Sequence, residues 1–387
     1  MANAGFLDAA SGQPLNPGGQ QALQAAFGGA WADPQRWYAD AQRSSMILAA
    51  ARASIAAALQ LRPPEVSFTS SAASAMGLAV SGALLARPGR VVCSAVEHSA
   101  LIGTAEEAVG AHNVHLVGVD ALGRIDQEEF ASAVCQPGIQ LACLQAANHE
   151  VGTRQPLVSM AAACRQAQVP LLVDATMTVG RESSSTIDLS LADIVCAHAI
   201  SWGGPSGVGV LGVRAGVPWR PPGYVDQREY QRVPGLPATP LIAVAARALE
   251  WSLASLPDFA AQAREHMAEL RQQVLTRVRG VTWLGDPDDG LSYLGAFSCL
   301  YTDAESLMQG LDAAGFSVSS GSSCVADTRR PSHVLTAMGA PSGGNVRVSL
   351  PIGGAASDIT GFVDALDATV ADIRKRFQAE DLAGLDS

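Results

Sequence analysis

Polar side chains with the chemistry of acids, bases and ligands follow several short apolar runs in the first half of the chain. They are the turn SSAAS at 70–74, Glu97 and His98 after VVCSAV, Asn148 to Glu150 after LACLQAA, Asp174 after PLLV, and His198 to Ser206 after ADIVCA. In an open parallel sheet, ligands bind where the carboxyl ends of the strands meet. We therefore expect these side chains to share one site.

The local context of Asp174 and His98 indicates what each could do. Asp174 closes an apolar run, so its carboxylate is predicted to be buried and to need a cationic or hydrogen-bonding partner. A protonated ring nitrogen would serve as that partner, and the alternative is that Asp174 caps the following turn. His98 follows a strand. It either stacks on an aromatic ligand or is an ordinary histidine with its hydrogen bonds satisfied inside the protein.

A loop that contains a cysteine, VSSGSSCVADTRRPSHVL at residues 318–335, is the second candidate for chemistry. The serines and glycine around Cys324 predict an exposed thiol, and nearby Arg329, Arg330 and His333 would favour its thiolate. The alternative is an inert surface thiol. The other six cysteines form no CxxC pair and are predicted to be small buried hydrophobes. They are Cys93, Cys135, Cys143, Cys164, Cys196 and Cys299.

Lysine is the scarcest basic residue of the chain. Of the 25 lysines and arginines, only Lys375 is a lysine, and its neighbours Arg374 and Arg376 indicate a solvated helix face near the C-terminus. Arginine replaces lysine on a surface but not in covalent catalysis, because a guanidinium stays protonated and forms no Schiff base.

The composition sets broad limits on function. The chain has 387 residues, 48% of them hydrophobic and 16% charged, with a net charge of −11. This length and composition predict a large core and two domains. The acidic charge disfavours nucleic acid and anionic membranes as partners. We find no secretory signal and no apolar run long enough to span a membrane, so we expect a cytoplasmic protein.

The order of apolar runs and helix-like segments predicts an α/β fold. Short β-branched runs separated by helical segments are typical of a mostly parallel sheet covered on both faces. Residues 219–240 are too rich in Pro and Gly to continue either element, and a long helical pattern follows from about 241 to 278. We predict an N-terminal arm at 1–20, a large domain at 21–255, and a small α+β domain at 256–387 that carries the Cys324 loop.

Seven stretches, in order along nearly the whole chain, resemble motifs of the cysteine desulfurases, which are class V aminotransferase-type enzymes of fold type I that use pyridoxal phosphate (PLP). FLDAASGQPL is similar to Y-L-D-N-A-A-T-T-P, VSFTSSAASAM to F-T-S-G-A-T-E-A-N, AVEHSAL to T-E-H-x-A-V, ANHEVGTRQP to N-N-E-I-G-x-x-Q-P, LLVDATMTVG to H-V-D-A-T-Q-S-V-G, VSSGSSC to S-S-G-S-A-C, and NVRVSL to I-R-F-S-L. The resemblance implies a fold type I PLP-transferase-like architecture, with a mostly parallel seven-stranded sheet flanked by helices and a smaller C-terminal domain.

The resemblance also implies roles for four residues. Asp174 would pair with the pyridine nitrogen of PLP, and His98 would stack on its ring. Arg347 would hold the substrate carboxylate, and Cys324 would take up sulfur as a persulfide.

The sequence departs from the family at the cofactor. The family strand after the aspartate ends in S-G-H-K-x-x-G-P-K-G-x-G, and its first lysine forms the Schiff base with PLP. Alignment on the glycine loop places Ser201 at that lysine and His198 at a phosphate-binding serine. Ala73 replaces a phosphate-binding threonine, His149 the asparagine that contacts the ring hydroxyl, and Met177 a glutamine. Residues 232–235 replace the R-S-G-T element that the family contributes from the partner subunit.

These departures favour a desulfurase-like protein that has lost covalent PLP chemistry and serves in sulfur transfer, as a partner or as a persulfide carrier through Cys324. The alternative is a class V enzyme with non-aldimine chemistry in a pocket rebuilt around His98, His149, Asp174 and His198. No metal-ligand spacing is present there. The lysine count opposes a third possibility, a conventional desulfurase. Because the family is dimeric, we expect a homodimer or a heterodimer with an active desulfurase, and possibly a sulfur-acceptor protein as a further partner.

Overall fold

The apolar runs form one large sheet. The computed structural model describes residues 4–321, 331–353 and 357–376. Its seven-stranded sheet has the order β1-β7-β6-β5-β4-β2-β3, and only β7 is antiparallel to its neighbours. The strands are β1 (Val66–Thr69), β2 (Arg90–Ser94), β3 (Val114–Val117), β4 (Ile139–Gln145), β5 (Leu171–Asp174), β6 (Ile194–His198) and β7 (Gly209–Val213). The predicted fold class is confirmed.

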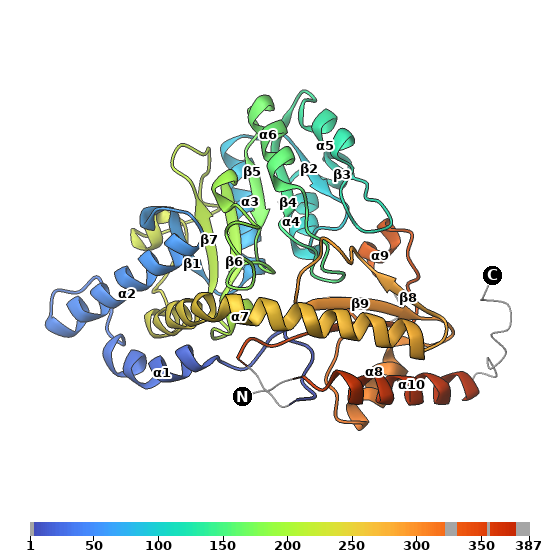
Figure 1. Cartoon of the computed structure of the whole chain (residues 1–387). Helices are drawn as coiled ribbons and strands as arrows, with labels where there is room; N and C mark the ends of the chain where they lie inside the picture. The colour runs from blue at the N-terminus through green and yellow to red at the C-terminus, as the bar shows by residue number, and fades with distance from the viewer. Residues whose placement is uncertain (1–3, 322–330, 354–356, 377–387) are drawn as a thin grey trace.

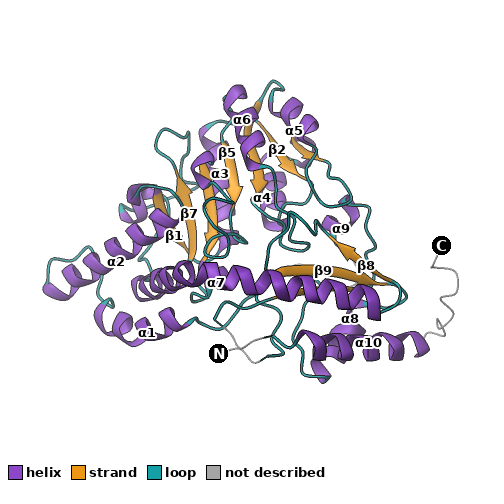
Figure 2. Cartoon of the chain, in the orientation of Figure 1, coloured by secondary structure: helices purple, strands orange, loops and turns teal. Residues whose placement is uncertain are grey.

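Helices cover both faces of this sheet, as Figure 2 shows. The helices are α1 (Pro17–Gly29), α2 (Ala39–Ala58), α3 (Ala72–Ala86), α4 (Ser99–Val109), α5 (Gln127–Val134), α6 (Leu157–Ala167), α7 (Thr239–Arg277), α8 (Ala304–Ala313), α9 (His333–Ala337) and α10 (Ile359–Arg376). Successive strand residues point to opposite faces. Val91 and Cys93 accordingly pack with α3 and α4, whereas Val92 lies in the core formed with α2, α5, α6 and the start of α7.

The second sheet is smaller and antiparallel. Its order is β10-β9-β8, built from β8 (Val281–Leu284), β9 (Leu294–Cys299) and β10 (Asn345–Ser349). The N-terminal arm lies beside β10: Ala9 N–H donates to the Ser349 carbonyl at 3.1 Å, and Ser349 N–H donates to the Leu7 carbonyl at 2.7 Å. These bonds bring the first residues of the chain to residues near its end.

Helix α7 is long enough to join both cores. It runs across the molecule below the large sheet and along β9 (Figure 1). Ile242 and Leu249 pack in the core of the large sheet, while Met267 and Leu270 pack in the core of the small one. The helical pattern predicted from about 241 to 278 is confirmed, and the predicted boundary at 255/256 falls inside this helix.

Two details differ from the sequence analysis. Helix α1 spans 17–29, where the sequence analysis predicted the end of an N-terminal arm and no helix. Cys135 is exposed, because it is the C-cap of α5 at the start of a surface turn, whereas Cys93, Cys143, Cys164, Cys196 and Cys299 are buried as predicted.

Asn16 links α1 to the large domain, and its removal is expected to destabilise the protein. Its Oδ1 caps α1 by accepting the Gly19 N–H at 3.0 Å, and its Nδ2 donates to the buried carbonyls of Trp202 and Ala248 at 3.0 and 2.8 Å. Asn16→Ala should lower the free energy of unfolding by about 2–3 kcal/mol, from the lost cap and the two carbonyls left without a donor. Asp303→Ala, which removes only a cap on α8, should cost about 1 kcal/mol. Equal losses in urea titrations would contradict this prediction.

Candidate functional site

The strand registers bring the predicted site residues to one edge of the large sheet. Gln145 at the end of β4 is opposite Asp174 at the end of β5, and Asp174 is opposite Cys196 of β6. His198 ends β6, two residues beyond Cys196. His98 and His149 follow β2 and β4. We call Glu97, His98, His149, Asp174 and His198 the acid–imidazole cluster.

Two imidazoles of the cluster lie against each other. The ring centroids of His98 and His149 are 5.0 Å apart, with their planes at 52°. His98 is also the N-cap of α4, and its Nδ1 accepts the Ala100 N–H at 3.1 Å. This bond fixes Nδ1 as the acceptor and leaves Nε2 as the protonated ring atom.

Asp174 is a buried acid that forms no ion pair with the residues that the structure describes. Its Oδ1 accepts the Thr176 N–H at 2.9 Å. Burial raises the pKa of this carboxyl, opposed by hydrogen bonds from Thr176 and by the nearby His98 ring. The prediction that Asp174 is buried is correct, and Asp174 also caps the following turn.

Glu97 is the most deeply buried acid of the cluster. Its side chain is 0% exposed, and its Oε1 accepts the Gln145 N–H at 2.8 Å. Its Oε2 has no hydrogen-bond partner. Burial raises the pKa of Glu97 well above its ordinary value, and the charge of Asp174 raises it further. Burial of Glu97 therefore favours its protonated form.

His149 and His198 present ring nitrogens that no described residue satisfies. Both nitrogens of His149 and the Nε2 of His198 are buried and lack hydrogen-bond partners. Burial lowers the pKa of each ring, and the charges of His98 and Arg347 lower that of His149 further. Both imidazoles are therefore neutral at neutral pH, each with one donor and one acceptor nitrogen.

Arg347 lies beside the cluster, and its terminal nitrogens already have partners in the chain. Nη2 donates to Asp8 Oδ1 at 2.9 Å and to Ser11 Oγ at 2.6 Å, and Nη1 donates to the His149 carbonyl at 2.8 Å. Only Nε is buried without a partner. The sequence analysis missed Asp8 and Ser11 as site residues, although the stretch FLDAASGQPL had been matched to a family motif.

Glu150 connects the cluster to the segment after residue 330. Ser332 Oγ donates to Glu150 Oε2 at 2.6 Å, and the His333 ring Nε2 lies 2.8 Å from the Glu97 carbonyl. Burial raises the pKa of Glu150 to about 7, against the opposing effects of Ser332 and Arg347. This side chain therefore changes its charge near neutral pH.

The remaining predicted positions lie on neighbouring elements. Ser201 is in the short 3-10 turn η4 (Ala199–Trp202), and its carbonyl accepts a hydrogen bond from Gln13 Nε2 at 3.0 Å. Ala73 is exposed in the first turn of α3. Met177 packs in the core of the small sheet, and its carbonyl accepts the Tyr293 hydroxyl at 2.6 Å.

Two predicted elements lie apart from this cluster. Cys324, Arg329 and Arg330 are outside the described residues. Arg232, in the predicted replacement for a partner-subunit element, donates from Nη1 to the Pro64 carbonyl at 2.9 Å and to Ser67 Oγ at 3.2 Å in its own chain.

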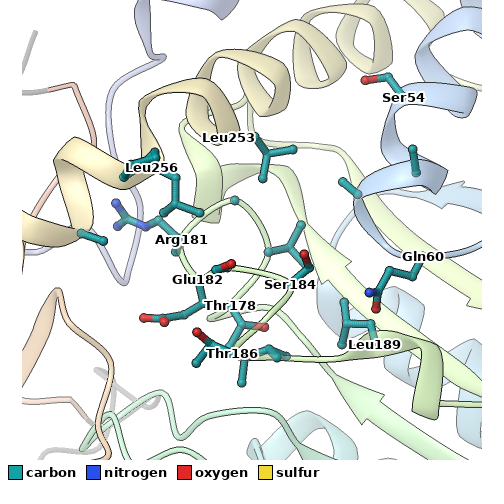
Figure 3. Close-up of a pocket in the computed structure, with 18 of the residues that line it drawn as sticks. Ser54, Gln60, Thr178, Arg181, Glu182, Ser184, Thr186, Leu189, Leu253 and Leu256 are labelled. Carbon is teal, nitrogen blue, oxygen red and sulfur yellow. The ribbon is translucent and has the colours of Figure 1, made fainter.

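A cavity of about 900 Å³ lies between α2, residues 178–189 and α7, and none of the predicted site residues lines it (Figure 3). The buried guanidinium of Arg181 turns away from Ser184 and Leu189 on the opposite wall. It lies 4.1 Å from the ring centroid of Tyr293 and donates to the Leu350 carbonyl at 3.2 Å. Arg181, the buried cation among the described residues that line the cavity, thus connects the large domain to the small sheet.

No group of three or more His, Cys, Asp or Glu side chains in the described ranges is arranged to hold a metal ion. No helix among the residues that the structure describes is long and apolar enough to cross a membrane.

The large α/β sheet is covered by helices on both faces and carries an acid and histidines at its carboxyl edge. The family model described as Aminotransferase class-V matches residues 20–362, and the chain belongs to this family. Among its relatives, a cysteine desulfurase of Cereibacter sphaeroides is 30% identical over 95% of this chain and 96% of its own length. The cysteine desulfurase NifS of Azotobacter vinelandii is 30% identical over 85% of this chain and 83% of its own.

A solved structure agrees with the observed architecture. A NifS-like protein from Rickettsia africae superposes with a TM-score of 0.84 at 20% identity, covering 95% of this chain and 99% of its own. At that identity the likeness shows the shared fold. The chain is therefore cysteine desulfurase-like in sequence and in fold.

The family implies PLP, and the residues present do not fit its covalent attachment. Ser201, predicted at the Schiff-base position, has a hydroxyl, which forms no imine. The only lysine of the sequence, Lys375, is exposed in the last turn of α10, on the small domain. At the N-terminus of α3, the hydroxyls of Ser70 and Ser71 contact that of Ser74 at 3.0 and 3.1 Å, and Ala73 offers none.

Proposed function

We propose that this protein is a cysteine desulfurase-like protein that has lost covalent PLP chemistry and serves in sulfur transfer through Cys324. The observation that carries the proposal is the position of the single lysine of the sequence. Lys375 lies on α10 rather than at the carboxyl edge of the large sheet. Without an amine there, no Schiff base can form with an aldehyde cofactor. Arginine cannot replace it.

The charges of the acid–imidazole cluster provide a second argument for the same proposal. PLP carries a phosphate dianion, and a buried dianion needs cations or several N–H and O–H donors. His198, predicted at a phosphate-binding position, is neutral because burial lowers its pKa. Asp174 and Glu97 add acidic groups to the site, and Arg347 is neutralised by Asp8.

In this proposal Cys324 carries sulfur without PLP. Its thiolate attacks the outer sulfur of a donor persulfide, forming the Cys324 persulfide and releasing the donor thiolate. An acceptor thiolate then takes the same sulfur and restores the Cys324 thiolate. Each step exchanges one S–S bond for another, so neither an oxidant nor a reductant is needed. The protein would act as a homodimer or as a heterodimer with an active desulfurase, and would pass sulfur to an acceptor protein.

A second candidate function is an enzyme with altered, non-aldimine chemistry at the acid–imidazole cluster. It is favoured by the buried ring nitrogens of His149 and His198, which no described residue satisfies. Buried polar atoms are normally paired, so unpaired ones in one place indicate a bound ligand or water. Any PLP in such a pocket would be held non-covalently.

The deciding experiment uses the full-length protein purified from its native host. We expect no aldimine absorbance band at about 400 nm and no release of sulfide from L-cysteine. After incubation with an active desulfurase and cysteine, the intact mass of the protein should increase by one sulfur atom. Cys324→Ser should abolish this gain, whereas Cys135→Ser, which changes an exposed thiol on α5, should leave it. An aldimine band with sulfide release would overturn the proposal. Labelling that survives Cys324→Ser would remove the role of Cys324.

A further inference from the structure

The cavity of about 900 Å³ between α2, residues 178–189 and α7 lies outside the acid–imidazole cluster. Its volume is within the range of pockets that hold small organic molecules, roughly 300–1,000 Å³. The cavity exists because small side chains occupy three of its sides, namely Ser54, Ala57 and Ala58 on α2, Ser183 and Ser184 after β5, and Ala260 on α7. A ligand in this cavity would be separate from any ligand of the cluster.

Apolar side chains form a large part of the cavity wall. Leu253 and Leu256 of α7 lie on one side, and Leu189 lies on another (Figure 3). Leu256 and Leu189 are 8% and 4% exposed, whereas Leu253 is 39% exposed. Covering apolar surface of this kind is favourable by about 25 cal/mol per Å². The wall therefore favours a ligand with an apolar body.

The charged groups lie at one end of the cavity. Glu182 is the one acid among the described residues that line it, and it is paired with Arg154 at 3.2 Å. In Figure 3, Glu182 lies on the side away from Ser54 and Gln60. Arg264 of α7 also lines the cavity and is exposed, and its charge lowers the pKa of Glu182.

Arg264 is the charge that remains available to a ligand. It forms no ion pair with the residues that the structure describes, whereas Glu182 already has the Arg154 guanidinium as its partner. A guanidinium stays protonated at any physiological pH. This end of the cavity is therefore positive whether Glu182 is ionised or not.

We infer that this cavity binds a small carboxylate with an aromatic or aliphatic body, with Arg264 as its counter-ion. The leucines of the wall cover the apolar body, and the guanidinium donates charge-assisted hydrogen bonds to the carboxylate. The inference goes beyond the proposed function, because it involves neither Cys324 nor the acid–imidazole cluster.

Two probes that differ in charge and share their ring system test the inference. 2-Naphthoate is an anion at neutral pH, and 2-naphthamide carries a neutral amide in place of the carboxylate. Isothermal titration calorimetry of the full-length protein at pH 7 should give an affinity for 2-naphthoate about three- to five-fold higher than for 2-naphthamide, the effect expected of an ion pair that is open to solvent. Equal affinities, a preference for the amide, or no binding of either probe would overturn the inference.

A pair of tryptophan variants tests whether the probes occupy this cavity. Ser184 and Ser185 are both exposed neighbours in the same loop, but only Ser184 lines the cavity. Ser184→Trp should fill the space and weaken the binding of both probes at least about ten-fold. Ser185→Trp adds the same side chain outside the cavity and should leave both affinities unchanged. Binding that is equal in the two variants would place the probes elsewhere and refute the site.

A second pair of variants assigns the charge preference to one residue. Arg264→Gln should make the affinities for the two probes equal, while the affinity for 2-naphthamide stays at the wild-type value. The matched control is Arg247→Gln, which removes an exposed arginine of α7 that pairs with Glu250 and does not line the cavity. It should keep the preference. A preference that persists in Arg264→Gln would refute its role as counter-ion, and the comparison of the probes in the wild-type protein decides if a variant does not fold.

This inference and the proposed function fail in different ways. An aldimine band with sulfide release from cysteine would refute the proposed loss of PLP chemistry and leave the affinities for the two probes unchanged. A lack of charge preference would refute only the carboxylate site.

Discussion

Arg52→Met is expected to lower the free energy of unfolding by about 3–5 kcal/mol, because it leaves the Glu229 carboxylate buried without its partner. The two side chains are 7% and 2% exposed and form a two-fold contact, Nη2 to Oε1 at 2.6 Å and Nη1 to Oε2 at 2.9 Å. Arg52 Nη1 also donates to the Val66 carbonyl at 2.7 Å, and Glu229 Oε2 accepts the Phe68 N–H at 2.7 Å. One ion pair thus holds residue 229 on the edge strand β1.

The same ion pair holds a strained backbone. Glu229, Tyr230 and Gln231 have φ values of 47°, 53° and 59°, in the left-handed region that non-glycine residues seldom occupy. Each such residue costs about 1–3 kcal/mol and persists only where its surroundings fix it. Arg52→Met should therefore also make residues 224–236 more sensitive to limited proteolysis in the folded protein.

Urea titrations measure the first effect, with two comparisons. Asp364→Asn, which breaks an exposed ion pair with Arg277, should cost less than about 1 kcal/mol. The double variant Arg52→Met/Glu229→Leu should cost less than the sum of its single variants, because neither charge is then left alone. Additive losses, or an Arg52→Met loss no larger than that of Asp364→Asn, would be inconsistent with a buried ion pair that anchors residue 229.

The large sheet could be predicted because its strands are short, apolar on both faces and bounded by helices, so local patterns determine each of them. Helix α1 could not. Its sequence begins with Pro-Gly-Gly, ends with Gly-Gly, and carries little apolar surface of its own. Asn16 ties its start to Trp202 and Ala248, far along the chain. Contacts of that range are not visible in local sequence.

The same distinction applies to the candidate site. Asp174 and the histidines could be predicted because each ends or follows a strand, and the parallel topology gathers those ends at one edge. The partners of Arg347 could not, since Asp8 lies 339 positions earlier in the chain. Nor does any local pattern reveal that Glu150 is paired with Ser332, 182 residues later.

Replacing Glu150 by glutamine is expected to stabilise the protein at alkaline pH. The pKa of Glu150 rises from 4.5 to about 7 on folding, mainly because the side chain is buried. The native state therefore binds the proton more tightly than the unfolded state. The stabilisation is fully present below pH 4.5 and is lost as the pH rises to about 7. The loss amounts to about 3 kcal/mol, since one pKa unit corresponds to 1.36 kcal/mol.

Glutamine keeps an oxygen that accepts the Ser332 hydroxyl and has no charge to bury. Glu150→Gln should therefore match the wild type near pH 4.5 and be up to about 3 kcal/mol more stable at pH 8, a difference that urea titrations at several pH values measure directly. Glu106→Gln makes the same chemical change on the exposed side of α4 and should stay within about 0.5 kcal/mol of the wild type at every pH. A difference between Glu150→Gln and wild type that does not grow between pH 4.5 and 8 would mean that Glu150 is ionised in the native protein throughout. The negative charge would then persist next to Ser332, on the segment that follows the Cys324 loop.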